Sequence, residues 1–292
     1  MKDTSKGRWQ MVEARYYEKL EGKKVRCKLC PHGCILSQGS TGFCRARKNV
    51  DGKLYSLNYG YISSIAFDPI EKKPLYHFYP GSSILSIGTF GCSFRCLHCQ
   101  NFEISQLTPN VFEVEIEKLI ALAKKDPKCI GIAFTYNEPT IWFEYVMDVA
   151  KAFKQEGLKT VLVTNGYLNE EPLQELLEVI DSANIDVKAF NDEFYKKVCS
   201  GDLETVKRFV EVCAKKIHIE ITTLIIPTLN DRDEEIENLA KWIASIDDRI
   251  PLHLTRYFPR YKMTLPPTPK ETLMRLREVA KKYLVNVYLG NI

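Results

Sequence analysis

Residues 83–101 read "SILSIGTFGCSFRCLHCQN", a short apolar run followed at once by three cysteines. The run is rich in Ile and Leu and ends at a glycine, which is typical of a buried strand in a parallel sheet. Cys92, Cys96 and Cys99 then follow with the spacing C-x3-C-x2-C. The stretch therefore predicts a strand that carries a loop of three thiols at its carboxyl end.

The pattern of strand, loop and helix repeats along the rest of the chain. Further apolar strands are expected at residues 129–136, 159–165, 184–190, 217–226 and 251–258. Amphipathic helical segments alternate with them, for example at residues 114–125, 232–247 and 269–283, and a last strand is expected at 285–289. Six βα units in sequence predict a parallel sheet that is either doubly wound or curled into a barrel.

Polar residues at the strand ends favour the barrel. Asp186 and Lys188 are two residues apart, so they share one face of their strand, and the same holds for Glu220 and Thr222. Charged side chains facing inward suit a lined active site, and in (β/α) barrels the functional groups gather at the carboxyl ends of the strands. We therefore predict an α/β fold in which residues 81–292 form a partial (β/α)6 TIM-like barrel.

Residues 1–80 are predicted to form an N-terminal Cys-rich extension with short strands. Its four cysteines have the spacing C-x2-C-x3-C-x9-C and are Cys27, Cys30, Cys34 and Cys44. They can close a structural zinc site, hold an auxiliary iron–sulfur cluster that relays electrons, or pack as metal-free thiols. All three interpretations stay open at this point, and His32 is a further candidate ligand.

The composition is that of a soluble globular protein, with 45% hydrophobic and 27% charged residues in 292. No apolar run reaches roughly 18 residues, and the start of the chain lacks the apolar region of a secretory signal. We therefore expect no membrane span and a cytoplasmic location. In that reducing compartment ten cysteines favour metal or redox chemistry over disulfides. Cys129, Cys199 and Cys213 lie outside both clusters and are expected to have no role.

The three-cysteine loop favours an iron–sulfur site. Thiolates are strong ligands for iron–sulfur clusters. Three of them hold three irons of a [4Fe–4S] cube and leave the fourth iron open, and an open position on a metal is typical of catalysis. The alternative is a zinc site that His98 or a distant cysteine completes.

At this point the chain resembles a known family. "CSFRCLHC" (92–99) is similar to the C-x3-C-x-φ-C motif of radical S-adenosylmethionine (SAM) enzymes, with His98 at the ring-bearing position. The resemblance extends to about residue 260 and is strongest to the pyruvate formate-lyase activating-enzyme branch. It implies a [4Fe–4S] cluster on Cys92, Cys96 and Cys99, with SAM at the open iron.

The resemblance also implies which residues contact SAM. "YNEP" (136–139) takes the place of the motif that contacts the methionine amino group, although the family often has two glycines before the glutamate. "TNG" (164–166) and "DVK" (186–188) resemble the motifs that hold the ribose and the methionine carboxylate. The SAM-binding residues implied are His98, Asn137, Glu138, Thr164, Asn165, Asp186 and Lys188, with His98 near the adenine.

A closer resemblance covers the extension as well. "CKLCPHGCILSQGSTGFCRAR" (27–47), "DPIEKKPLYHFYPG" (68–81) and "HLTRYFPRYKM" (253–263) are similar to the radical SAM enzyme of the AmmeMemoRadiSam system. Such chains often continue past the stretch "YLGN" (288–291) into another cysteine pair, so a short member or a shortened chain is expected. This resemblance implies a class of chemistry and no particular substrate.

The implied function is reductive cleavage of SAM to a 5′-deoxyadenosyl radical that abstracts hydrogen from a protein or peptide. The expected partners are an electron donor such as ferredoxin or flavodoxin, the substrate protein, and AmmeMemoRadiSam proteins. The residues expected to face the substrate are Glu220, Thr222, His253 and Arg256, although His253 fits a packed core position equally well.

Two other functions stay open. Within the same class, the substrate is a nucleic acid or a small molecule. A net charge of +4 and the lack of an appended binding module argue against nucleic acid. From a different class, the chain is a zinc-binding interaction module without catalysis.

Overall fold

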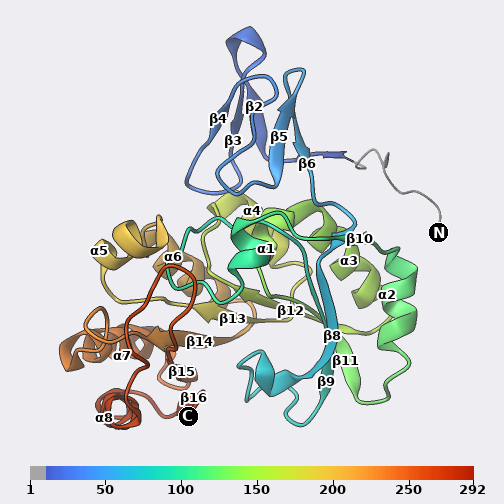
Figure 1. The fold of residues 1–292 in the computed structure, drawn as a ribbon. Helices are drawn as coiled ribbons and strands as arrows, with labels where there is room; N and C mark the ends of the chain where they lie inside the picture. Colours follow the sequence, from blue (N-terminus) through green and yellow to red (C-terminus); the bar gives the residue numbers. More distant parts are fainter. Residues whose placement is uncertain (1–10) are drawn as a thin grey trace.

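The computed structural model describes residues 11–292; residues 1–10, where the predicted extension begins, lie outside the described residues. The centre of the molecule is an eight-stranded sheet in the order β16-β15-β14-β13-β12-β11-β9-β8 (Figure 1). Only its edge strand β8 runs antiparallel to its neighbour. The strands are β8 (Ser64–Pro69), β9 (Ser83–Gly88), β11 (Cys129–Phe134), β12 (Lys159–Thr164), β13 (Ser182–Asp186), β14 (His218–Ile225), β15 (Leu252–Arg256) and β16 (Val287–Gly290).

This sheet confirms the predicted fold class. Each of the six strands predicted for the barrel is present, and they neighbour one another in chain order and run parallel. The two edge strands of the sheet stand at opposite ends of the order and do not pair, so the barrel is open. The carboxyl ends of the parallel strands consequently meet along one edge of the sheet, where the three-cysteine loop and the predicted SAM contacts lie. Glu220 and His253 lie instead near the amino ends of β14 and β15.

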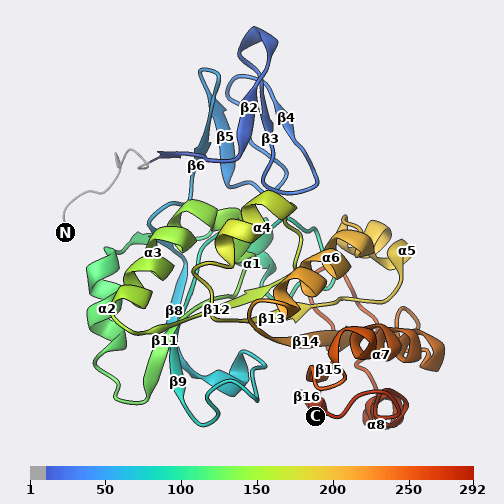
Figure 2. The same ribbon diagram turned by 180° about the vertical axis from the view of Figure 1, so that it is seen from behind.

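Amphipathic helices cover the outer side of the curved sheet (Figure 2). In α7, for example, Ile236, Leu239, Ala240 and Ile243 are buried, which is the spacing of one helix face. No helix within residues 11–292 is both long enough and apolar enough to cross a membrane. The α-helices are α1 (Phe102–Gln106), α2 (Ile116–Ala123), α3 (Phe143–Gln155), α4 (Glu170–Leu176), α5 (Asp192–Phe194), α6 (Leu203–Ala214), α7 (Asp233–Asp247) and α8 (Lys270–Ala280).

The part before β8 forms a small lobe of short antiparallel strands, which stands at the top of Figure 1. One of its sheets has the order β1-β6-β5 and the other the order β2-β3-β4. The strands are β1 (Val12–Glu13), β2 (Tyr17–Lys19), β3 (Val25–Cys27), β4 (Ile35–Leu36), β5 (Arg47–Val50) and β6 (Lys53–Ser56), followed by β7 (Tyr61–Ile62), which pairs with β10 (Phe112–Glu113). β8 precedes residue 80 but belongs to the large sheet. The domain boundary at residue 80 stays a prediction.

Residues 70–82, here named the closing segment, connect β8 to β9 and lie across the inner face of the sheet. The amide of Asn184 on β13 donates to the Pro74 carbonyl at 2.8 Å, and the backbone N–H of His77 donates to Glu220 on β14 at 2.7 Å. The remaining short helices are η1 (Glu21–Lys23), η2 (Ile70–Lys72), η3 (Pro139–Trp142) and η4 (Tyr195–Cys199), of which η4 is a π-helix.

Candidate functional site

The three-cysteine loop follows β9 directly, and several donors point at its sulfur atoms. The backbone N–H of Phe94 donates to the Cys92 sulfur at 3.3 Å, and the amide of Asn165 lies 3.6 Å from the same sulfur. The backbone N–H of Asn101 donates to Cys99 in the same way. Burial raises the pKa of both thiols, so these donors and a bound metal are what would favour the thiolate form.

The middle of the loop pairs with η4. The backbone N–H groups of Arg95 and Leu97 donate to the carbonyls of Cys199 and Val198 at 2.8 and 3.0 Å. Cys96 is buried between them, and its thiol is hydrogen-bonded to the thiol of Cys199. Sequence reasoning missed Cys199 because it is far from the loop in the chain and has no recognisable spacing to it. Only the π-helical turn of η4 brings it there.

Glu138 connects the ends of β11 and β12. Its buried carboxylate accepts from the Thr140 N–H at 2.9 Å, the Thr164 hydroxyl at 2.7 Å and the Asn165 N–H at 2.8 Å. Burial raises the pKa of Glu138 although these donors oppose the shift. Since the Asn165 amide reaches Cys92, the carboxylate also fixes the residue that supports the loop.

Asn137 supports the first turn of the loop. Its side-chain oxygen accepts from the Thr89 N–H at 2.9 Å, and its amide nitrogen donates to the Gly91 carbonyl at 2.9 Å. The residue before it, Tyr136, has a φ of 71°, in the left-handed region that glycine adopts without strain. Both polar ends of Asn137 are therefore used within the protein.

Asp186 and Lys188 lie on the other side of the loop. The Lys188 ammonium is 2.6 Å from the Asp186 carboxylate. Although burial opposes its charge, Asp186 and the Cys96 thiol hold the pKa of Lys188 above its ordinary value. Burial and the Lys188 charge lower the pKa of His98 to about 3, so this imidazole is neutral at physiological pH, and its Nδ1 is buried without a protein partner.

The arrangement fits the cofactors that the loop predicts. Within residues 11–292 no three His, Cys, Asp or Glu side chains are placed to hold a single metal ion. A cubane requires no such convergence, because each of its thiolates binds a different iron. The buried Thr89 hydroxyl beside Asn137 and the Nδ1 atom of His98 have no protein partner and are available to a polar ligand such as SAM, whereas the Thr140 hydroxyl is bonded to Glu138.

The extension brings its four cysteines together next to this loop. Cys27, Cys30 and Cys44 are buried, Cys34 is half-buried, and all are free thiols. The Nε2 atom of His32, considered above as a spare ligand, lies 2.7 Å from the Ser93 carbonyl of the three-cysteine loop. Zinc or a second cluster at these thiols stays a prediction.

The residues predicted to face the substrate do not form one group. Glu220 and His253 are buried and pair at 2.6 Å beneath the closing segment, where the ring of Tyr76 packs against His253. Thr222 donates to the side-chain oxygen of Asn184 at 2.9 Å. Arg256 lies apart, with its Nε donating to the Thr268 carbonyl at 2.7 Å. Their role toward a substrate stays a prediction.

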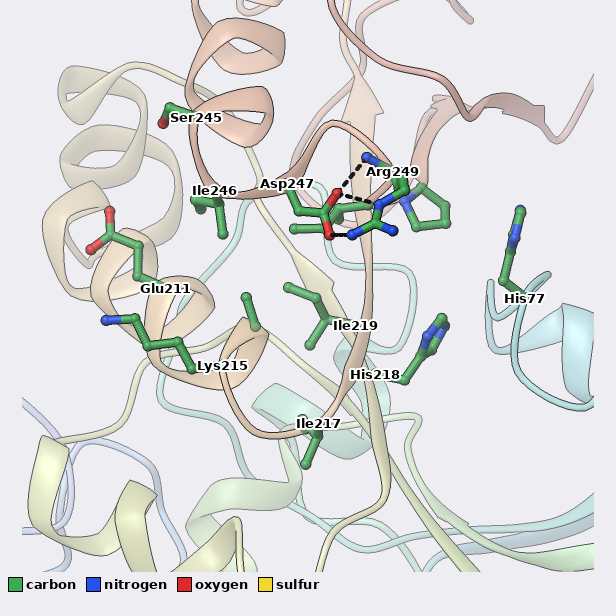
Figure 3. A pocket seen from close by; sticks show the side chains of 13 residues that line it. His77, Glu211, Lys215, Ile217, His218, Ile219, Ser245, Ile246, Asp247 and Arg249 are labelled. Carbon is green, nitrogen blue, oxygen red and sulfur yellow. Dashed lines mark hydrogen bonds and ion pairs between the residues drawn. The ribbon is translucent and has the colours of Figure 1, made fainter.

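A cavity of about 690 Å³ opens where α6 and α7 meet the start of β14 (Figure 3). His77, Lys215, His218 and Arg249 are among its lining residues, and Arg249 is paired with Asp247 at 2.9 Å. None of the cysteines or predicted SAM contacts lines it. The cavity is therefore separate from the loop at the carboxyl ends of the strands.

Comparison with known proteins finds a family match that includes the three-cysteine loop and most of the parallel strands. The family described as the Radical SAM superfamily matches residues 86–243. An uncharacterized protein of Methanocaldococcus jannaschii is 44% identical, over 97% of this chain and 86% of its own length. The pyruvate formate-lyase 1-activating enzyme of Escherichia coli K12 is 26% identical, over 66% of this chain and 86% of its own length.

Solved structures show the same fold. A radical SAM methyltransferase from Sphaerobacter thermophilus superposes with a TM-score of 0.54 at 12% identity, covering 96% of this chain and 76% of its own. The Escherichia coli relative confirms the expected similarity to activating enzymes, whereas the finer resemblance to the AmmeMemoRadiSam enzyme stays a prediction.

Proposed function

Because this chain belongs to the radical SAM superfamily and is a SAM-dependent radical enzyme, we propose that Cys92, Cys96 and Cys99 bind its [4Fe–4S] cluster and that it abstracts hydrogen from a protein or peptide. When bound, the reduced cluster and SAM supply the radical chemistry, and the protein positions the cofactors and excludes water. The protein's residues therefore act mainly by holding groups in place.

One observation carries the proposal: the predicted SAM-binding residues gather around the predicted cluster ligands on both sides of the loop. Asn165 donates to Glu138 through its backbone and reaches Cys92 through its side chain. Lys188 places its charge beside Cys96 and His98 on the other side. A SAM molecule at the loop would therefore meet the ends of β11, β12 and β13 together.

The geometry also divides the SAM-site residues by role. The side-chain polar atoms of Asn137 and Glu138 are hydrogen-bonded within the protein. We therefore assign these two residues to holding the three-cysteine loop and the turn after β12. The unpartnered Thr89 hydroxyl and the Asp186–Lys188 pair are the groups left to contact SAM. Hydroxyls suit the ammonium or ribose of SAM, and an ammonium suits its carboxylate.

The relatives favour a protein substrate. The Escherichia coli relative is named for the activation of another enzyme, pyruvate formate-lyase. By this similarity we propose a protein partner at the open edge of the barrel, a ferredoxin or flavodoxin as electron donor, and a cytoplasmic location, which suits free cysteines. A nucleic acid or a small molecule is the alternative substrate within the class.

The test is anaerobic reconstitution with iron and sulfide, reduction by dithionite, and measurement of 5′-deoxyadenosine after SAM is added. We expect wild type and Cys129→Ala to produce it, because Cys129 lies on β11 outside both cysteine clusters, and we expect Cys99→Ala to produce none. The proposal would be refuted if wild type with a complete iron–sulfur cluster makes no 5′-deoxyadenosine and its spin-resonance signal does not change when SAM is added. Colourless protein with zinc and no iron would instead support the interaction module.

A further inference from the structure

We propose that Cys27, Cys30, Cys34 and Cys44 bind a second iron–sulfur cluster, which passes electrons to the cluster on the three-cysteine loop. The inference rests on the proposed function, since it requires a redox cluster at that loop. It goes beyond it by giving the N-terminal lobe a role in electron entry.

The two cysteine clusters are in direct contact. The backbone N–H of Cys92 donates to the carbonyl of Cys44 at 3.2 Å, so one hydrogen bond separates a ligand of one site from a ligand of the other. Gly91 permits this approach, because a Cβ there would lie 2.4 Å from the same carbonyl oxygen. A structural zinc ion could stabilise the lobe at any distance from the three-cysteine loop. Electron transfer between two clusters, in contrast, requires the two cysteine sites to be close.

Two further contacts fix the lobe on the loop. Arg95 of the loop donates to the Phe43 carbonyl at 2.6 Å, and its guanidinium lies 4.5 Å from the centre of the Phe43 ring. The Nε2 atom of His32 is 2.7 Å from the Ser93 carbonyl. Phe43 and His32 are neighbours of the thiols in sequence, so the contacts hold the cysteine-bearing turns themselves.

The backbone at the thiols donates hydrogen bonds to them. Cys27, Cys30 and Cys44 each accept a hydrogen bond from the backbone N–H two residues later, and the same arrangement occurs at Cys92 and Cys99. At the remaining thiol, Cys34, the N–H of Phe43 donates at 3.5 Å. Hydrogen bonds to sulfur stabilise ligating thiolates and tune cluster potentials. Both sites are therefore built in the same way.

A buried donor lies beside the thiols. Arg47 is 1% exposed, and its charge acts on Cys27 and Cys44. Its two terminal nitrogens bind Glu144 at 3.0 and 2.7 Å, while its Nε–H is buried without a protein partner. An orphaned buried donor costs free energy unless a bound group accepts from it. A cluster with four thiolates carries negative charge and provides such an acceptor.

The proposed role favours a cluster over one zinc ion. Zinc has no redox chemistry, so a zinc ion at these thiols could not pass an electron to the adjoining loop. In the proposed step, a reduced ferredoxin or flavodoxin gives one electron to the N-terminal cluster and is oxidised. That electron then reduces the loop cluster, so the N-terminal cluster returns to its oxidised state.

The decisive experiment compares metal content after anaerobic reconstitution of three full-length proteins: wild type, Cys92→Ala/Cys96→Ala/Cys99→Ala, and Cys27→Ser/Cys30→Ser. We expect iron and sulfide per chain to fall about twofold from wild type in each variant, and the loop variant to keep a spin-resonance signal on reduction. A loop variant that holds zinc or no metal overturns the inference. A loop variant with as much iron as wild type shows instead that the loop binds no cluster, which is the failure of the proposed function.

A second measurement tests electron delivery without using turnover. The rate at which flavodoxin reduces the loop cluster, relative to dithionite, is followed by spin resonance in wild type and Cys27→Ser/Cys30→Ser. We expect this ratio to fall at least tenfold in the variant. An unchanged ratio in a variant whose circular dichroism matches wild type contradicts electron entry through the lobe.

Discussion

Cys199 places a fourth thiol against the three-cysteine loop, next to Cys96. Its thiol is hydrogen-bonded to Cys96, and Lys188 lies close to both. In the metal-free protein this hydrogen bond raises the pKa of Cys96. With Cys96 bound to iron as a thiolate only Cys199 could donate, and a donor to a ligating sulfur would stabilise the more negative, reduced state of a cluster. Cys199 is therefore expected to set how easily the loop cluster is reduced.

Cys199→Ala should make the loop cluster harder to reduce, because it removes this hydrogen bond from the Cys96 sulfur. We expect the reduction equilibrium to shift by up to about tenfold, or roughly 59 mV for one electron. A redox titration followed by spin resonance measures the shift. Cys199→Ser should stay near wild type, since it keeps a donor, and Cys213→Ala provides a buried cysteine control from α6. Equal potentials in all four proteins would mean that Cys199 only fills space.

Sequence patterns could predict the site only where chemistry follows from local spacing. Cys92, Cys96 and Cys99 lie in one loop, so their association needs no knowledge of the fold. The support given by Cys199 and the unpartnered Nε of Arg47 depends on packing between segments far apart in the chain. The Asn137 amide lies against the loop backbone. Its expected contact with SAM stays a prediction, because no spacing in the sequence decides between these two partners.

At the scale of elements, the contact between the N-terminal lobe and the three-cysteine loop depends on one glycine. Gly91 has a φ of +89°, and a Cβ there would lie 2.4 Å from the Cys44 carbonyl. Gly39 has a similar φ of +78°, with nothing within 4 Å of the same position. Comparing alanine substitutions at the two glycines therefore separates the free-energy cost of a left-handed backbone from the cost of pushing against the Cys44 carbonyl.

Gly91→Ala should destabilise the protein more than Gly39→Ala. Both substitutions force alanine into the left-handed region, at about 1 kcal/mol, but only the first also pushes the lobe from the loop. We expect the free energy of unfolding to fall by roughly 1–3 kcal/mol more for Gly91→Ala, within the range for strained or overpacked sites. Denaturant unfolding of both variants measures the difference. Equal losses in the free energy of unfolding would show that the lobe can move away from the loop without destabilising the protein.

The closing segment is held to the sheet by a buried carboxylate. Glu220 accepts from the His77 N–H at 2.7 Å and contacts His218 and His253 at 3.1 and 2.6 Å. Burial alone would raise the pKa of Glu220, but the two histidines and the backbone donors lower it to about 2. The ionised form is thus favoured in the folded protein relative to the unfolded chain, where carboxyl groups of glutamate titrate near 4.3.

This shift gives a pH dependence with a definite sign. A carboxyl group with a lowered pKa stabilises the fold above its unfolded value, and that stability is lost as the pH falls from about 4.3 toward 2. We expect Glu220→Gln to cost on the order of 2 kcal/mol near neutral pH, and the gap to wild type to shrink as the pH falls below about 4. Denaturant unfolding from pH 3 to 7 measures the gap, and exposed Glu178→Gln is the control. A gap that does not change with pH contradicts the assignment.

At the scale of the whole molecule, the repeated βα pattern was enough to predict the parallel strands, because each unit carries its own apolar run and its own helix. The antiparallel edge strand of the sheet was harder to predict. β8 lies within the predicted extension but joins the sheet antiparallel to β9, because the closing segment reverses the chain between them. That pairing depends on how residues 70–82 fit over Asn184 and Glu220, which are more than a hundred residues further along.

The two proposed clusters should make stability depend on metal in one part of the molecule only. A cluster binds the folded ligands and not the unfolded chain, so loading stabilises the elements that carry its thiols. Hydrogen exchange of the loaded and the metal-free protein should differ at residues 25–50 and 88–101, by at least about tenfold in protection. Strands β13, β14 and β15 carry no predicted ligand, so their exchange should be nearly unchanged. Protection gained only at residues 88–101 would mean that the lobe binds no metal, and protection gained throughout would mean that the lobe and the sheet unfold as one unit.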